Sequence, residues 1–375
     1  MKQISINQCG VLIVMCIFAN KILLLPSLMY EKTSADSIFV LITLFLLDFI
    51  MLPILIKLKS LYPEQKFYDI LKDKLGSLVT KIIYITLLIF FFFKCLLVFS
   101  ITYVYFKQQI YQDEFIFMAL ISFFPVINHA VFCGLRSFSR TMELFFGIVI
   151  AGFIFCLVIS LFTPISSPLF FTSTAKEFFT SMHNHIFAFG DFIFLFLAMD
   201  RLDFKKGKVK SLYFYTLFAM FLVVLLFFLF YAKYQMTAFM HNNALADLLV
   251  FSVQFNAIGR LDIIAMLTIM IITLFQMEIF SYAFCDCFMS IFPLNKIYSV
   301  AVFDVLFLIL YYVFIGKYEI MVKSSLLWLP YLSIFINYIL PIITLIIIII
   351  DIRQHGNRPV KIKSHLKEKN IKEKV

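Results

Sequence analysis

Long runs of apolar residues recur along the whole chain, and they constrain its fold more than any other feature. A helix that crosses the ~30 Å hydrocarbon core of a bilayer needs about 20 such residues. We predict ten membrane-spanning segments: 9–29, 37–57, 80–106, 115–133, 142–163, 184–201, 211–232, 260–292, 297–316 and 326–350. Hydrophobic residues make up 63% of the 375, and charged residues only 14%. No soluble core could absorb that balance, so the sequence predicts an all-α polytopic membrane protein.

The basic residues predict the orientation of these spans. With the N-terminus in the cytoplasm, 23 of the 32 Lys and Arg residues fall on the cytoplasmic side, and seven fall outside. Such a bias is typical of cytoplasmic loops. We therefore predict that both termini are cytoplasmic, with a transmembrane domain at 1–350 and a basic tail at 351–375. The net charge of +10 then faces anionic lipid, and it does not indicate a nucleic-acid partner.

Two of the predicted spans are interrupted by polar residues. In the first, Asn20 and Lys21 stand within an apolar run, and Pro26 follows without the N–H that a continuing helix would use. In the span at 184–201, Gly190 and Asp191 interrupt the run in the same way. Broken helices at membrane depth are tolerated only where protein or a water-filled cavity satisfies the freed backbone groups. Both interruptions therefore indicate a buried site.

The two interruptions occupy corresponding places in the chain. Each opens a set of five spans, at about 9–163 and 184–350, and the two sets have opposite orientations. Interrupted segments related in this way are typical of transporter binding sites. Freed N–H groups can bind a carboxylate, and freed carbonyls can bind an ammonium or a cation. A zwitterionic amino acid is the simplest ligand with both groups. We predict a ligand site at Ala19, Asn20, Lys21, Phe189, Gly190 and Asp191.

Several short motifs resemble the spore-germination permease family, the B subunits of germinant receptors, which are related to amino acid/polyamine/organocation transporters. They lie in family order along nearly the whole membrane region: Ile4-Ser5-Ile6-Asn7-Gln8, Leu23-x-x-Pro26, Leu61-Tyr62-Pro63, Gly134-Leu135-Arg136 with Arg140, Phe189-Gly190-Asp191 and Ile258-Gly259-Arg260-Leu261-Asp262. The sequence departs from the family pattern at Lys21, where a small residue is usual, and at Asp191, where Glu is usual.

The resemblance implies a LeuT-like 5+5 inverted repeat in the inner membrane of a bacterial endospore. It also implies assembly with an A subunit and a lipoprotein C subunit, and sensing of a small nutrient germinant. In the LeuT-like fold the spans at 80–106 and 260–292 flank the site, which adds Lys94 and Glu278 to the predicted ligand-binding residues. Structural ion pairing is the alternative for these charges: Lys21 with Asp48 or Asp191, and Lys94 with Glu278. For Asp48 and Asp304 we favour structural pairing.

Two functions remain open at this level. One is a receptor subunit that binds a germinant and signals through its partners. The other is a proton- or ion-coupled amino acid transporter in which Asp191 or Glu278 carries the proton. We predict no enzyme, metal site or cofactor, since the sequence has no nucleophile–base set, paired-Cys motif or phosphate loop. At Lys21 a fixed ammonium could occupy the place of a coupling cation, or form a resting ion pair with Asp191 that ligand binding exchanges.

Overall fold

The computed structural model describes residues 3–19, 21–109, 124–162, 169, 171–203, 209–241, 243–250, 262–314 and 327–355. These residues form helices joined by turns, together with one isolated parallel bridge between Ile4 and Leu202. The predicted all-helical fold is confirmed, and it fits a polytopic membrane protein.

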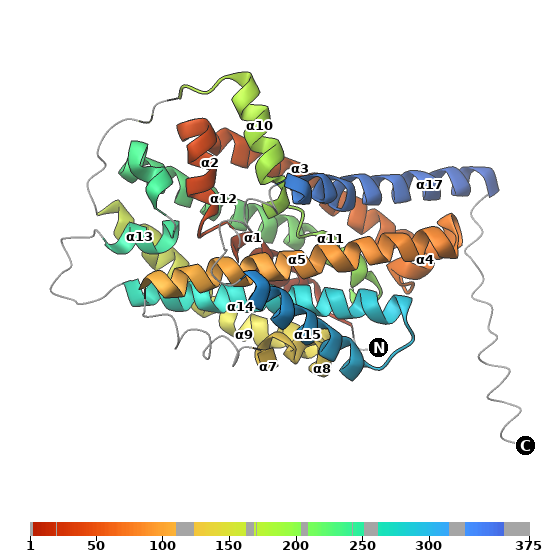
Figure 1. The fold of residues 1–375 in the computed structure, drawn as a ribbon. Helices are drawn as coiled ribbons and strands as arrows, with labels where there is room; N and C mark the ends of the chain where they lie inside the picture. The colour runs from red at the N-terminus through yellow and green to blue at the C-terminus, as the bar shows by residue number, and fades with distance from the viewer. Residues whose placement is uncertain are drawn as a thin grey trace, which may run out of the picture.

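The helices are arranged as a bundle of long rods with several short pieces (Figure 1). In chain order they are α1 (Ile6–Ala19), α2 (Leu25–Thr33), η1 (Ser34–Asp36), α3 (Ser37–Leu61), α4 (Phe67–Leu75), α5 (Ser77–Gln109), α7 (Phe124–Ile127), α8 (His129–Cys133), α9 (Leu135–Leu161), α10 (Ala175–His185), η2 (Ile186–Ala188), α11 (Ile193–Leu197), η3 (Met199–Arg201), α12 (Val209–Tyr234), η4 (Gln235–Met240), α13 (Ala244–Val250), α14 (Asp262–Ile291), α15 (Lys296–Phe314), the π-helix η6 (Ile334–Ile339) and α17 (Leu340–His355).

Seven helices among these described residues are long and apolar enough to cross a membrane. They run at Leu25–Leu61, Ser77–Lys107, Leu135–Leu161, Val209–Met240, Ile263–Ile291, Lys296–Val313 and Leu327–Gln354. Each corresponds to one of the ten predicted spans, and Leu25–Leu61 also includes the last residues of the span at 9–29. The other three predicted spans are the two interrupted ones and the span at 115–133, of which 115–123 lie outside the described residues. Ten crossings and the LeuT-like inverted repeat therefore stay predictions.

Helix α1 lies in the core of the bundle, against α9, α12 and α14. Its sequence is apolar on all sides, as a helix without a solvent face should be, and every residue except Asn7 is buried. Gly10 allows α12 to approach closely, since a Cβ at this position would lie 2.3 Å from the ring of Tyr215. The first interruption is therefore held at the end of a helix that protein surrounds.

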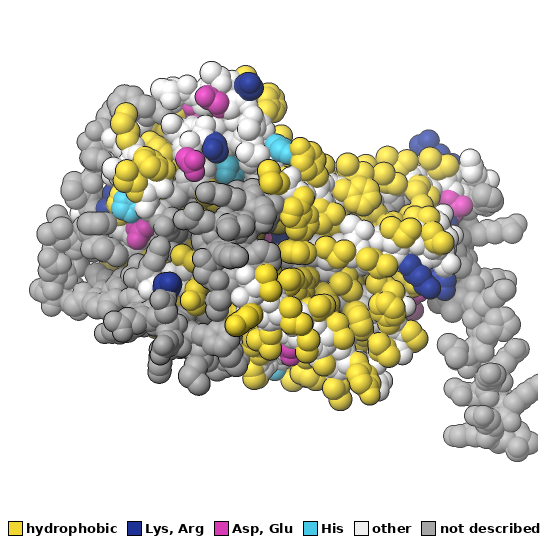
Figure 2. All heavy atoms as spheres, in the orientation of Figure 1, with side chains coloured by type: hydrophobic (Ala, Val, Ile, Leu, Met, Phe, Trp, Pro, Cys, Tyr) yellow, Lys and Arg dark blue, Asp and Glu magenta, His cyan; other side chains and the backbone are white. Residues whose placement is uncertain are grey.

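The outer surface of the bundle is mostly apolar. Large side chains such as Leu46, Leu144 and Phe214 are more than half exposed, which would be costly in water but is expected against lipid. Figure 2 shows apolar side chains across the broad middle of the visible face, with charged side chains gathered toward its ends. The start of α1 and the end of α17 lie toward the same end of the bundle, near α4 (Figure 1).

Candidate functional site

The first interruption separates α1 from α2. Helix α1 ends at Ala19, residues 21–24 form a turn, and Pro26 stands in the first turn of α2, where its missing N–H costs nothing. Two carbonyls in the turn, those of Ile22 and Leu23, accept hydrogen bonds from the backbone at the start of α13. Neighbouring protein thus satisfies backbone groups that the break exposes. Asn20 lies outside the described residues.

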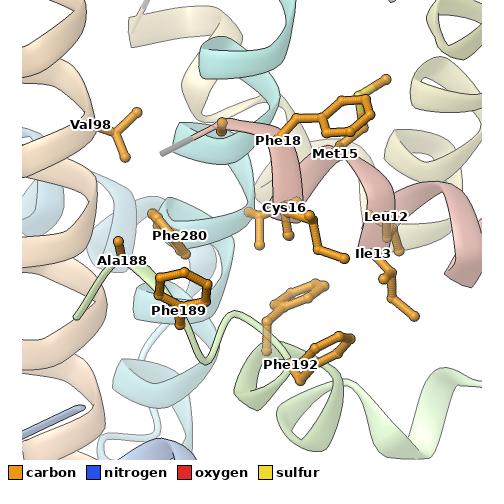
Figure 3. Packing of buried hydrophobic residues seen from close by; sticks show 14 of the residues in the cluster. Leu12, Ile13, Met15, Cys16, Phe18, Val98, Ala188, Phe189, Phe192 and Phe280 are labelled. Atoms are coloured by element: carbon orange, nitrogen blue, oxygen red, sulfur yellow. The ribbon is translucent and has the colours of Figure 1, made fainter. Parts of the chain in front are cut away.

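The second interruption separates η2 from α11. Phe189 is extended, Gly190 has φ +77°, and a turn through Asp191 leads into α11. Glycine adopts a positive φ at no steric cost. Glycine is also required here for lack of space, because a Cβ on residue 190 would lie 2.0 Å from Nδ2 of Asn337. In Figure 3 the segment through Ala188 and Phe189 passes below Cys16 of α1.

Two lysines meet at the carboxylate of Asp191. Lys21 Nζ, from the first break, lies 3.3 Å from Oδ2, and Lys94 Nζ, from α5, lies 2.7 Å from Oδ1. Each ammonium also donates to a carbonyl of the second break: Lys21 to Ala188 at 2.9 Å and Lys94 to Phe189 at 2.9 Å. The side chains of all three ionic residues are at most 5% exposed. Each charged group thus has an opposite charge within 3.3 Å, and each ammonium also has a carbonyl oxygen, which offsets part of the cost of burying the network.

Aromatic rings complete the surroundings of the two ammonium groups. Lys21 Nζ lies 4.7 Å from the centroid of Phe189, and Lys94 Nζ lies 5.3 and 5.6 Å from those of Phe90 and Phe280. A ring face attracts a cation most when both are desolvated. The site thus offers a cation two kinds of favourable contact, oxygens and ring faces.

A second carboxylate fixes the backbone of the same break. Asp48 of α3 accepts from the Gly190 N–H at 3.0 and 3.2 Å, and from the Tyr338 hydroxyl at 2.6 Å. Asn337 donates to the Phe189 carbonyl at 3.3 Å. Asn337 and Tyr338 both belong to the π-helix η6, a distortion frequent at functional sites. Two carboxylates and two ammonium groups therefore surround the break, and their formal charges cancel.

The space left at this network is small. The cavity that reaches both Asp48 and Asp191 has a volume of about 10 Å³, barely enough for one water molecule. On its other sides it is closed by apolar side chains of α1 and of the segment around α11, among them Ile13, Cys16 and Phe192. Figure 3 shows Phe192 below α1, on the side of Ile13 and Cys16. In this conformation no amino acid could enter without a rearrangement.

The structure brings together most of the predicted site. Lys21, Lys94, Phe189, Gly190 and Asp191 converge, and Ala19 is buried at the end of α1. Glu278 lies apart from them: its carboxylate is 3.6 Å from His129 Nδ1 and lines a different cavity. Of the ion pairs considered from the sequence, the structure contains Lys21 with Asp191. Lys94 also pairs with Asp191, and not with Glu278. A ligand-binding role for all eight residues stays a prediction.

Sequence reasoning missed Asn337 and Tyr338. A polar Asn337 inside an apolar span was a usable signal, because Asn in a membrane helix usually bonds to a neighbouring helix. Nothing in the sequence indicates the π-helix that turns both side chains toward the break. Asp48, which the sequence suggested as a structural residue, binds the break directly through Gly190.

The end of the bundle where α1 begins is held together by backbone hydrogen bonds and an ion pair. The backbone of Ile4 exchanges hydrogen bonds with Arg201 and Asp203, at 2.7 and 3.0 Å. The Arg201 guanidinium lies 2.7 Å from the carboxylate of Asp286 on α14. A cavity of about 620 Å³ opens beside this ion pair and is lined by three further basic residues, Arg136, Arg140 and Lys296. The break network is thus separated from this end by a layer of specific contacts.

The sequence matches a known protein family. The model of a family described as spore germination protein matches residues 3–320. The chain belongs to the spore germination protein family. The matched region includes both interruptions and all four charged residues of the network, whereas Asn337 and Tyr338 lie beyond it. A search among curated proteins gave no match to this spore germination protein. Family and fold together make it an integral membrane protein related to germination.

Proposed function

We propose that this protein is the membrane-embedded B subunit of a nutrient germinant receptor, and that a small amino-acid-like germinant binds where the two breaks meet. One observation carries the proposal: two buried lysines from different helices share Asp191 and also hold the carbonyls of the break. Such an arrangement already binds ammonium groups. A free ligand that supplies an ammonium can therefore compete with one of them.

A zwitterion fits this exchange better than a simple cation. If the germinant's ammonium replaces that of Lys21 on Asp191, the released Lys21 needs a new anion in a buried place. The germinant's own carboxylate supplies it. The total charge of the site then stays zero before and after binding, which avoids the large cost of an uncompensated charge in the membrane.

Binding in this way would act as a switch. The cavity of about 10 Å³ must enlarge, so the bound and empty forms differ in the positions of Lys21 and of the break backbone. A ligand shifts such an equilibrium by its difference in affinity for the two forms. We propose that an A subunit and a lipoprotein C subunit respond to the shift in the inner membrane of an endospore, with both termini of this chain in the cytoplasm.

Replacing Lys21 with Ala in spores tests the proposal. We expect the chain to assemble, since Asp191 keeps its contact with Lys94 at 2.7 Å. The germinant concentration for half-maximal germination should rise at least tenfold, because the germinant's carboxylate loses its partner. The matched control is Lys32→Ala, which removes an exposed lysine that pairs with its neighbour Glu31. An unchanged concentration dependence in Lys21→Ala spores, with normal protein levels, would reject the exchange.

Ion-coupled amino acid transport is the alternative function, and purified protein in liposomes distinguishes it. A coupled transporter must admit a mobile cation or proton to its site, but ammonium groups fixed to the chain hold the carbonyls of Ala188 and Phe189. We therefore expect binding of radiolabelled amino acids without uptake under an imposed proton or sodium gradient. Saturable, gradient-driven uptake by the wild-type protein would establish the transporter and defeat the receptor-only function.

A further inference from the structure

A second polar cluster lies between α8, α14 and α15, where another helical segment is interrupted. Helices α7 and α8 meet at Asn128, whose side-chain amide donates to Asp304 of α15 at 2.9 and 3.0 Å. The hydroxyl of Ser281 on α14 donates to the same Asn128 side chain at 3.0 Å. These contacts fix the start of α8. They place the next residue, His129, beside Glu278 of α14.

Glu278 is a buried carboxylate with unused bonding capacity. Its side chain is 3% exposed, and it stands near the middle of the membrane-length helix α14. Oε1 lies 3.6 Å from His129 Nδ1, which is too long for a hydrogen bond. Oε2 has no hydrogen-bond partner among the described residues. Burying a carboxylate without hydrogen-bond partners costs free energy. An ionisable residue inside a membrane helix is therefore, by default, a candidate functional residue.

The carboxylate opens into a cavity that is mostly apolar, with His129 and Thr141 as the other polar residues of its lining. The cavity has a volume of about 430 Å³, in the range of small-molecule sites. Its walls include Phe145 of α9 and the residues Ile271, Leu274 and Phe275 of α14. Phe145 and Val126, both on its rim, are partly exposed on the outside of the bundle. A histidine and an acidic side chain interrupt the apolar surface over α7 and α8 in Figure 2.

The composition of this cavity selects one class of ligand. An apolar body gains by filling the aromatic and aliphatic walls, and a positively charged donor gains by meeting Glu278. A carboxylate or phosphate head would be repelled by Glu278 in its ionised form, whereas an ammonium head would stabilise that form. A metal ion would find only His129 and one carboxylate, and the described part of the chain holds no group of three or more metal-ligating side chains. An amine with an alkyl or aralkyl body satisfies both the charge and the walls.

We propose that the cavity at Glu278 is a binding site for small hydrophobic amines, entered from the side of the bundle. The site is separate from the network at Asp191 and does not depend on the function proposed for that network. Glu278 binds the ammonium head, His129 borders it, and Phe145 and Phe275 contact the body.

Binding of radiolabelled octylamine to the purified full-length protein tests the site. We expect saturable binding that excess octylamine displaces, that octanol displaces much less and that octanoate does not. Glu278→Gln should weaken binding at least tenfold. The control Glu143→Gln, an acid-to-amide change on α9 at a residue paired with Gln8, should stay within twofold of wild type. In the cavity-filling variant Leu274→Trp the carboxylate is kept, but the larger side chain occupies the cavity. This variant should abolish octylamine binding.

Three results would overturn the proposal. The first is an absence of saturable octylamine binding to the wild-type protein. The second is equal competition by octylamine and octanol, which would show an apolar cavity without charge recognition. The third is wild-type affinity in Glu278→Gln. The first two results are obtained with the wild-type protein, so they do not depend on whether a variant folds. Size-exclusion chromatography and thermal unfolding show whether each variant is folded.

Discussion

Replacing Asp191 with Asn is expected to destabilise the protein more than removing either lysine. The substitution leaves two buried ammonium groups, those of Lys21 and Lys94, without their shared carboxylate. Loss of one partner from a buried ion pair costs about 3–5 kcal/mol, and here one substitution strands two charges. We expect thermal unfolding of the purified protein in detergent to shift down by more than 10 °C, or folded protein to be lost.

The double variant Asp191→Asn with Lys94→Met separates charge from shape. Removing one stranded ammonium should recover a large part of the lost stability, because contacting residues in one network are not additive. Asp304→Asn is the matched control: Asp304 is another intramembrane aspartate, but its partner among the described residues is a neutral amide, that of Asn128. If Asp191→Asn and Asp304→Asn unfold at the same temperature, the two lysines do not depend on Asp191.

The two interruptions could be predicted because their signals are local. Lys21 and Asp191 are charges within apolar runs, Pro26 lacks an N–H, and Gly190 permits a positive φ that other residues rarely adopt. Each violates a rule that continuous membrane helices obey. The sequence also placed the seven long helices, because their apolar runs are long enough to be unambiguous.

The pairing of the charges could not be predicted, since it depends on which helix faces meet. Lys94 could have paired with Glu278 by its position in a span, yet it reaches Asp191 while Glu278 faces His129. A long lysine side chain can serve several partners, and the choice is made by packing between α5 and α14. Tyr338 was missed for the same reason, because the π-helix that orients it is a tertiary effect.

Under the proposed function, the network gives a closed site a way to respond to a ligand. Its charges cancel, which stabilises the empty form, and each ammonium is attached to a flexible four-carbon chain. One lysine can therefore leave without unfolding a helix, provided that another ammonium takes its place. Asp48 and Asn337 bind the backbone of the break at Gly190 and Phe189. In the proposed exchange the backbone of the break would therefore stay in place while one ammonium group replaces another.

Gly190→Ala is the second substitution with a large expected effect, and it tests that fixed backbone. Alanine must adopt φ near +77°, which costs about 1–2 kcal/mol. Its Cβ would also lie 2.0 Å from Nδ2 of Asn337, so either η6 moves or the break does. We expect a lower unfolding temperature and a weakened germinant response, since displacement of Gly190 breaks the hydrogen bond from its N–H to Asp48.

Gly147→Ala is the matched control for this substitution. Gly147 lies within α9, and a Cβ added there meets no neighbouring helix or side chain among the described residues within 4 Å. Alanine there should stabilise the helix by about 0.5–1 kcal/mol. The variant Gly190→Ala with Asn337→Ala removes the amide that the new Cβ meets, so it should regain the steric part of the loss but not the part due to φ. Full recovery in that double variant would show that the positive φ is unimportant. If Gly190→Ala alone changes neither the unfolding temperature nor the germinant response, the break does not require the conformation seen here. That result would also contradict the role of Asp48 in fixing the backbone of the break.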